Sequence, residues 1–426
     1  MGFWAICAIA AASIALMLWR PRGIQEAWWV GAGVALLLAL RLLPLRTAAH
    51  AIGEGTDVYL FLTGMMLLSE LANEHGVFDW LAAHAIRGAA GSPFRLFLLI
   101  YAAGIAVTAL MSNDATAVVM TPAVLAAIKR GGGKSLAPEP YLFACAMIAN
   151  AASFLLPISN PANLVVYQAG GMPSLARWFA MFLLPSIASI ATTLLVLSVY
   201  FRRELHGGKL PASTPHALSP TGRLTLAGIA CMSAVLIAAS ALRWQLGLPA
   251  CLAALAMSLL VSWRAGLGER RTAARLREVF AGVSWSVLPL VAALFCLVAA
   301  VNRIGLEAHV AALLQTATTW PRTTHVFGLG LGTGIASNLV NNLPLGLVMG
   351  GAVHTAGIHG IASDAVLLGV DLGPNLSITG SLATILWLIR IRREGVSVGA
   401  GRFLLVGSLA MPLALAASLA TLFLRR

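Results

Sequence analysis

The sequence predicts an all-α polytopic membrane protein made of two halves with opposite orientation in the bilayer. The chain has 426 residues, of which 59% are hydrophobic and 10% are charged, whereas a typical soluble domain has about 25% charged residues. So few charges cannot cover the surface of a soluble protein of this size. The composition therefore excludes a soluble enzyme, a disordered protein and a disulfide-stapled secreted domain. The apolar runs and a repeated set of polar motifs complete the prediction.

The basic and sulfur-bearing residues fit the same class. The net charge of +13 comes from basic residues in short loops between apolar runs, where they orient a membrane protein. The five cysteines lie inside apolar stretches without CxxC spacing, at Cys7, Cys145, Cys231, Cys251 and Cys296. We therefore expect no disulfide framework, no zinc or other metal site, no cofactor and no nucleic-acid partner.

Ten apolar runs approach or exceed the length of about 20 helical residues that the hydrocarbon core requires. The first is not expected to be a cleaved signal peptide, because Arg20 and Arg22 follow it rather than precede it. The ten predicted spans are residues 3–19, 27–45, 57–73, 141–167, 177–201, 223–242, 246–263, 284–302, 365–389 and 403–424.

Two further stretches, residues 94–128 and 323–353, are too long for one straight span and too short for two. Each has a polar break near its middle, at Ser112-Asn113-Asp114 in the first and between Ser337 and Asn342 in the second. Each therefore predicts a re-entrant hairpin, in which two half-length helices meet at a polar tip.

The basic residues predict the orientation. Ten spans with two hairpins place 20 of the 28 Lys and Arg on one face, whereas twelve full spans give a split of 16 to 12. Because the positive-inside rule favours the sharper asymmetry, we place the richer face in the cytoplasm and both termini in the periplasm. Twelve spans remain the alternative.

Polar motifs of the first half recur 220–229 residues later. Residues 73–76 align with 302–305, 112–116 with 340–344, and 156–161 with 376–381. Five spans and one hairpin per half turn the second half upside down, which is the inverted-repeat plan of secondary transporters. We expect a first repeat at 1–201, a cytoplasmic linker rich in Pro, Gly and Ser at 202–222, and a second repeat at 223–426.

Four polar breaks, at residues 112–116, 159–163, 338–344 and 371–381, interrupt the apolar runs. Pro and Gly remove helical hydrogen bonds there, and lipid tolerates such breaks only inside protein or along a wet cavity. Half-helix N-termini and neutral polar side chains suit a small polar solute or oxyanion; for any one residue the alternative is that it only joins helices. The candidate substrate-binding residues are Asn113, Asp114, Thr116, Ser159, Asn160, Asn163, Asn341, Asn342, Asn375, Thr379 and Ser381.

Asp114 and Asp371 are the acids predicted to lie deep in the membrane. An ionisable residue at that depth indicates function by default. Because burial disfavours a charged carboxylate, both are candidates to carry a coupling proton. We expect the acids near span ends, such as Glu54 and Glu70, to contact the membrane interface. The glycines between Gly328 and Gly334 predict close helix packing rather than a dinucleotide loop.

At these motifs the sequence resembles the ion transporter superfamily and, within it, the arsenite efflux permease family. The run from Asp371 to Asn375, followed by residues 380–387 (GSLATILW), carries most of the resemblance. Residues 112–122 and 341–344 add to it, and residues 159–164 resemble the second polar break of the wider superfamily. The resemblance covers nearly the whole chain.

The resemblance implies a transporter, not an enzyme, that exports trivalent arsenite and antimonite from the bacterial cytoplasm across the inner membrane. It implies that the proton gradient drives export, that a soluble arsenite-stimulated ATPase subunit associates with some relatives, and that hairpin tips and broken spans form the binding site. The Asn-Pro-Ala-Asn run at 160–163 departs from the family and is more like anion-transporting relatives.

The residues themselves favour a neutral solute. Arsenite near neutral pH is mostly an uncharged trihydroxide, and the four breaks offer amides and hydroxyls without Lys, Arg or Cys, whereas a dicarboxylate site favours cationic residues. The alternatives are a sodium-coupled anion carrier or Na⁺/H⁺ antiporter of the same superfamily, since broken helices also hold Na⁺, and a passive channel. A membrane enzyme is disfavoured, because the HExxH motif is absent from the sequence.

Overall fold

The computed structural model describes residues 2–132, 136–207, 217–266 and 269–424. Every regular element within these ranges is helical, which confirms the all-α class. The predicted linker 202–222 falls only partly within them, because residues 208–216 lie outside the described residues.

The first half runs from α1 to α11, and a break separates α8 from α9. Its elements are α1 (Gly2–Trp19), η1 (Pro21–Gly23), α2 (Glu26–Ala39), α3 (Leu45–Glu54), α4 (Thr56–Glu74), α5 (Val77–Gly88), α6 (Pro93–Leu110), the π-helical turn η2 (Ala115–Met120), α7 (Thr121–Gly132), α8 (Glu139–Ala151), η4 (Pro157–Ser159), α9 (Pro161–Val166), α10 (Leu175–Tyr200) and α11 (Arg202–His206).

The second half repeats this order of elements. It contains α12 (Pro220–Ala241), α13 (Gly247–Gly266), α14 (Glu269–Gly282), α15 (Val287–Asn302), α16 (Leu306–Ala317), α17 (Arg322–Val340), α18 (Asn342–Thr355), α19 (Ile361–Leu372), η5 (Gly373–Asn375), η6 (Ile378–Gly380), α20 (Leu382–Arg393), α21 (Ala400–Thr421) and η7 (Leu422–Leu424).

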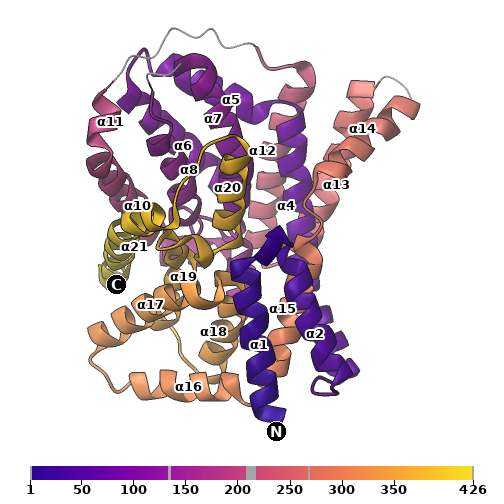
Figure 1. Cartoon of the computed structure of the whole chain (residues 1–426), viewed down its shortest axis with the longest axis vertical. Coiled ribbons are helices and arrows are strands. Elements are labelled where there is room, and N and C mark those ends of the chain that lie inside the picture. The colour runs from indigo at the N-terminus through magenta and orange to yellow at the C-terminus, as the bar shows by residue number, and fades with distance from the viewer. Residues whose placement is uncertain (1, 133–135, 208–216, 267–268, 425–426) are drawn as a thin grey trace.

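The helix contacts of the two halves correspond one to one. Between the halves, the packing of α4 on α13 matches that of α15 on α2; within the halves, α5 on α7 matches α16 on α18, and α6 on α8 matches α17 on α19. Helix α5 lies near the upper end of the molecule and its counterpart α16 near the lower end (Figure 1). The two halves are therefore related by an internal inversion.

Each predicted hairpin has both of its open ends on one side of the molecule. The Tyr141 hydroxyl, near the start of α8, donates to the Pro93 carbonyl at the start of α6 (3.2 Å), so the chain that leaves α7 returns to where α6 begins. In the second half the Thr355 hydroxyl, at the end of α18, donates to Glu307 on α16 (2.8 Å), and α16 leads into α17. The open ends of the first hairpin thus lie on the side of α5, and those of the second lie on the side of α16.

Six helices among the described residues are long and apolar enough to cross a membrane on their own: α1, α6, α10, α12, α13 and α21. Several predicted spans are absent from this set because they are divided or short. Residues 141–167 are divided among α8, η4 and α9, residues 365–389 are divided among α19, η5, η6 and α20, and α2 ends at Ala39 rather than at residue 45. Helix α2 stops because Arg41 has a positive φ of 55° and Pro44 begins the next helix.

Glycines bring α17 and α19 into close contact. A Cβ on Gly369 would lie 2.5 Å from the Gly330 carbonyl oxygen, and one on Gly373 would lie 2.4 Å from the Gly334 carbonyl oxygen. Both pairs are spaced by four residues, so they occupy one face of each helix. This contact positions the broken segment after α19 against the tip of the second hairpin.

Candidate functional site

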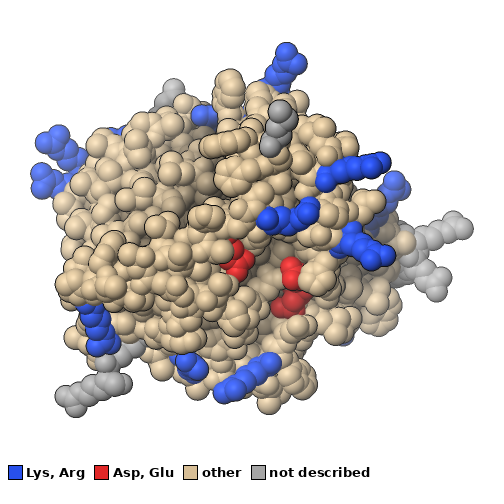
Figure 2. Space-filling model, turned by 90° about the horizontal axis from the view of Figure 1, so that it is seen from below, with Lys and Arg blue, Asp and Glu red and all other residues tan. Residues whose placement is uncertain are grey.

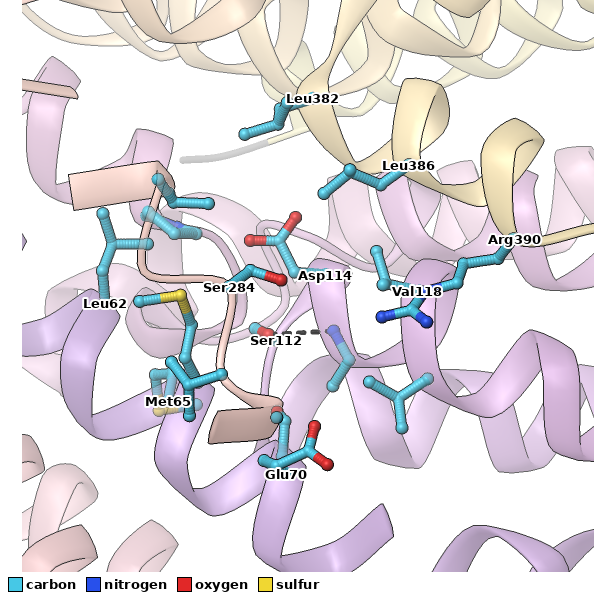
Figure 3. Close-up of a pocket in the computed structure, with 18 residues that line it drawn as sticks. Leu62, Met65, Glu70, Ser112, Asp114, Val118, Ser284, Leu382, Leu386 and Arg390 are labelled. Carbon is cyan, nitrogen blue, oxygen red and sulfur yellow. Dashed lines mark hydrogen bonds between the residues drawn. The ribbon is translucent and has the colours of Figure 1, made fainter. Parts of the chain in front are cut away.

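A mostly apolar pocket with several polar side chains lies where the first hairpin tip meets the starts of α9 and α20. It encloses about 660 Å³ of space, part of it open to solvent, and α4 and the turn before α15 complete its wall. Side chains from these separate elements surround one space, with Asp114 and Ser284 on one side and Arg390 reaching in from α20 (Figure 3). Its polar lining residues are Ser69, Glu70, Ser112, Asp114, Ser284 and Arg390.

Side chains at the first tip cap the returning arm of the hairpin. The Ser112 hydroxyl accepts from the Ala115 amide (3.1 Å), and the Asn113 carbonyl oxygen accepts from the Asp114 amide (3.0 Å). The hydroxyls of Thr108 and Thr116 join the two arms (2.8 Å). These bonds satisfy helix ends without using the Asp114 carboxylate, which faces the pocket.

The break between α8 and α9 connects the two halves through one side-chain contact. The Asn160 carbonyl oxygen caps α9 by accepting from the Ala162 amide (3.0 Å), and its amide nitrogen donates to Asp371 Oδ1 on α19 (2.8 Å). Ser159 donates to the Ala109 carbonyl near the first tip (3.3 Å). The Asn163 amide donates to carbonyls of the break itself, at Ser153, Leu156 and Pro157.

Asp371, near the end of α19, is fully buried. Its Oδ2 atom has no hydrogen-bond partner among the described residues. Close by, Asn150 on α8 donates to the Asn375 carbonyl oxygen (3.0 Å), and Asn375 donates to the Met147 carbonyl (3.0 Å). One amide–acid contact thus links the start of α9 to α19, and a pair of amides links α8 to η5.

The second hairpin tip is bonded to the break between α19 and α20. The Asn338 amide donates to the Gly373 carbonyl (2.9 Å), and its carbonyl oxygen accepts from the Ser377 amide (3.1 Å) and hydroxyl (2.7 Å). The Thr379 hydroxyl donates to the Asn338 backbone carbonyl (3.0 Å), and Asn341 donates to the Thr379 carbonyl (3.3 Å). Asn341 has a positive φ of 73°, which Asn adopts more readily than most residues.

The predicted site residues therefore fall into two groups. Asp114 lines the pocket, together with Ser112 from the same break. The others hold the breaks together: Asn113, Thr116, Asn160, Asn163, Asn341, Asn375 and Thr379 make the contacts given above, Ser159 also accepts from the Leu156 amide, Ser381 caps α20 through the Thr384 amide, and Asn342 is buried at the start of α18.

Sequence reasoning did not place Arg390 or Glu70 in the site. The sequence predicts an interfacial position for Glu70 and a cytoplasmic charge at Arg390, and the structure places both side chains in the lining of the Asp114 pocket. The spacing of Arg390 in the sequence could have indicated its position in the pocket. It lies one helical turn beyond Leu386, on the face of α20 that meets the pocket.

A larger basic hollow adjoins the Asp114 pocket. It spans about 1890 Å³ of largely open space and shares Ser284, Leu382 and Arg390 with the smaller pocket. Arg20, Arg392 and Arg393 also line it, and Arg20 pairs with Glu26 (2.9 Å). The Asp114 pocket is thus continuous with an open vestibule on the side of α20.

Apolar helices, breaks at repeat-related positions and a polar pocket between them define a multi-pass membrane transporter. The family model described as "Citrate transporter" (CitMHS) matches residues 14–370. The chain belongs to this family.

Relatives match over nearly the whole chain. The "Arsenical pump membrane protein" of Escherichia coli (strain K12) is 26% identical, with 98% of each chain covered. The "Putative arsenical pump membrane protein" of Bacillus subtilis (strain 168) is 23% identical, with 96% of each covered. In fold, the chain resembles the YdaH transporter of Alcanivorax borkumensis, described as having an unusual topology. The TM-score is 0.60 at 15% identity, covering 97% of this chain and 98% of that one.

Proposed function

We propose that this protein exports trivalent arsenite and antimonite from the cytoplasm in exchange for protons, with the Asp114 pocket as its binding site. The observation that carries the proposal is a carboxylate at a broken-helix tip that faces a polar pocket and uses none of its oxygens to hold the fold. The names of the relatives supply the solute class.

The pocket chemistry suits an uncharged trihydroxide. Asp114 and Glu70 accept hydrogen bonds, the hydroxyls of Ser112 and Ser284 both donate and accept, and Arg390 donates. A proton on Asp114 removes an acceptor that the solute needs. Proton and solute thus compete for one carboxylate, and this competition is the simplest way to couple their opposite movements.

The architecture supports alternating access between the two sides. In the proposed division, residues 1–201 and 223–426 are the inverted repeats, and residues 202–222 link them in the cytoplasm of a bacterial cell, with both termini periplasmic. The two hairpins re-enter the inner membrane from opposite sides. Asp371 takes part in coupling through Asn160, and a soluble ATPase subunit is an optional partner.

The proposed site extends over both tips and both breaks. As the pocket opens and closes, the amides and hydroxyls that now join the breaks become available to the solute. This set comprises Asn113, Asp114, Thr116, Ser159, Asn160, Asn163, Asn341, Asn342, Asn375, Thr379 and Ser381.

The first test uses a bacterium that lacks its own arsenite pump. Expression of this chain should restore growth on arsenite and antimonite, and everted vesicles should accumulate both solutes when acidified inside. Growth and accumulation that equal those of an empty-vector strain would refute the proposal. An ATPase-free vesicle preparation that still responds to the proton gradient would show that the subunit is dispensable.

A second candidate function is sodium-coupled anion transport or Na⁺/H⁺ antiport. Arg390 in the pocket favours an anion, because a guanidinium binds carboxylates through paired charged hydrogen bonds, and the matching family is described as a citrate transporter. Sodium-dependent citrate uptake, without any protection of cells from arsenite, would establish this candidate in place of the first.

A further inference from the structure

A second polar cavity lies on the face opposite the Asp114 vestibule. It encloses about 1310 Å³ of largely open space between the end of α3, the end of α9, α15, α16 and α18. Seen from below, where α16 lies, the visible acidic side chains sit in hollows of the face and Lys and Arg project around them (Figure 2). The polar side chains of this cavity are Glu54, Gln168, Asn302, Arg303 and Glu307.

The internal inversion relates this cavity to the Asp114 pocket. In both, one wall is the long helix of a repeat (α4 or α15), a second is the returning arm of a hairpin (η2 or α18), and a third is the second half of a broken helix (α20 or α9). The cavity between α15, α18 and α9 is therefore the counterpart of the proposed binding pocket, formed on the other side.

Its two amide side chains are held in one orientation. Asn302 Nδ2 donates to Glu307 Oε2 (2.8 Å), and Gln168 Nε2 donates to the Glu54 backbone carbonyl (3.0 Å). A carboxylate and a carbonyl only accept, so turning either amide over would place oxygen against oxygen. The amide oxygens of Asn302 and Gln168 are thereby fixed, and both are buried without a partner among the described residues.

Two further hydrogen bonds involve the charged side chains of the cavity wall. The Thr355 hydroxyl donates to Glu307 Oε1 (2.8 Å), and Arg303 donates to the Leu42 carbonyl (2.7 Å). The cavity wall therefore carries two carboxylates, two amide oxygens without a partner among the described residues and the Arg303 guanidinium. An anion would face the carboxylates of Glu54 and Glu307, whereas a neutral molecule with several hydroxyl groups can donate to these oxygens.

We propose that this cavity is a second binding site for a neutral trihydroxide, which receives the solute on the α16 side before release. The inference rests on the proposed function and adds a site to it. Its physical consequence is side-specific: solute that accumulates on the α16 side should occupy this site and slow further export, and this inhibition should depend on the amide of Gln168.

The test compares Gln168→Leu with Gln315→Leu, a matched change on α16 outside the cavity lining. Purified full-length protein is reconstituted in proteoliposomes, and arsenite is added to either side in turn. Loss of one acceptor should raise the arsenite concentration that half-inhibits transport from the α16 side by about tenfold, the range of one hydrogen bond. The arsenite concentration that gives half-maximal transport from the opposite side should change less than about twofold. Gln315→Leu should match wild type in both concentrations.

A cavity-filling variant guards against a folding defect. Leu347→Phe narrows the same cavity from α18 without touching either amide and should also raise the half-inhibiting concentration on the α16 side only. Wild-type protein that transports arsenite, with both cavity variants behaving like Gln315→Leu, would overturn this inference alone. Inhibition from the α16 side by sodium in place of arsenite would overturn it in favour of a cation site. Wild-type protein that moves no arsenite would overturn the proposed function as well.

Discussion

The tips of the two hairpins occupy equivalent places in the two repeats but are bonded differently. At the first tip, Ser112 and Asn113 each accept one local backbone hydrogen bond, and Asp114 faces the pocket. At the second tip, Asn338 makes side-chain bonds to Gly373 and Ser377 in the break between α19 and α20. The first tip is therefore open to a cavity, and we call it the open tip. The second is closed by hydrogen bonds to the neighbouring break, and we call it the bonded tip.

In the proposed alternating-access mechanism the site opens to one side at a time, so one open and one closed tip fit a state in which the site faces a single side. If both tips were open, solute and protons would leak through; if both were bonded shut, neither side would have access. The bonds of the second tip are neutral and mutually exchangeable, so they are suited to breaking and reforming. In the first repeat the position of Asn338 corresponds to Leu110, which has no polar side chain. One equivalent bond is made there, because Ser159 donates to the Ala109 carbonyl as Thr379 does to the Asn338 carbonyl.

Replacing the acid of the open tip should have the largest effect. Asp114→Asn keeps the size and the acceptor oxygen but removes the proton-binding group, so the response of arsenite transport to a pH gradient should be lost completely while exchange of labelled for unlabelled arsenite persists. Vesicle flux with and without the gradient measures this. Asp371→Asn, at the buried acid that lines no part of this pocket, should weaken the gradient response less. A full response in Asp114→Asn would reverse these roles.

Opening the bonded tip should cost stability. Asn338→Ala removes bonds to the carbonyls of Gly334 and Gly373 and to Ser377, and we expect a loss of about 2–4 kcal/mol because several buried groups lose partners. Asn113→Ala, at the open tip, removes one local bond and should cost about 1 kcal/mol. Thermal unfolding in detergent compares the two. Equal losses would mean that the tips do not differ in the way described.

The sequence predicts much of this comparison. Apolar runs too long for one span, each interrupted by small polar residues, predict both hairpins, and Pro and Gly after Asp371 and around Asn160 predict the broken helices. Recurring motifs predict the inversion, because homologous breaks keep their spacing even when the residues change. These features are local, so they can be read from consecutive residues.

The contents of the pocket could not be predicted in the same way. Arg390 and Glu70 reach Asp114 only because α20 and α4 pack against the first hairpin, and no local pattern specifies that packing. Asn338 was recognised as part of a polar break, but its partners lie 35 and 39 residues further along the chain. The sequence locates the breaks, and tertiary packing decides which of them faces a cavity.

The glycine contact behind the second tip should contribute a smaller share of its stability. Gly369→Ala places a methyl group 2.5 Å from the Gly330 carbonyl oxygen, so α17 and α19 must separate, at a cost of about 1–3 kcal/mol. The control is Gly332, which lies on α17 two residues after Gly330, where nothing comes within 4 Å of an added methyl group. Gly332→Ala should be neutral or stabilise the protein by up to about 1 kcal/mol. Unfolding midpoints that shift alike in both variants would contradict the assigned contact.

Arg390 should produce the smallest change if the solute is neutral. Arg390→Gln keeps a hydrogen-bond donor at the edge of the pocket and removes the charge. The arsenite concentration that gives half-maximal flux should therefore change less than about threefold. An anionic substrate would lose a charge-assisted hydrogen bond of about 1.5–3 kcal/mol, which is roughly 10- to 150-fold in affinity. Concentration dependence of arsenite and of citrate flux, measured on the same vesicles, separates these outcomes. A large loss for arsenite would mean that the open tip selects charge, and the comparison between the tips would then describe an anion carrier.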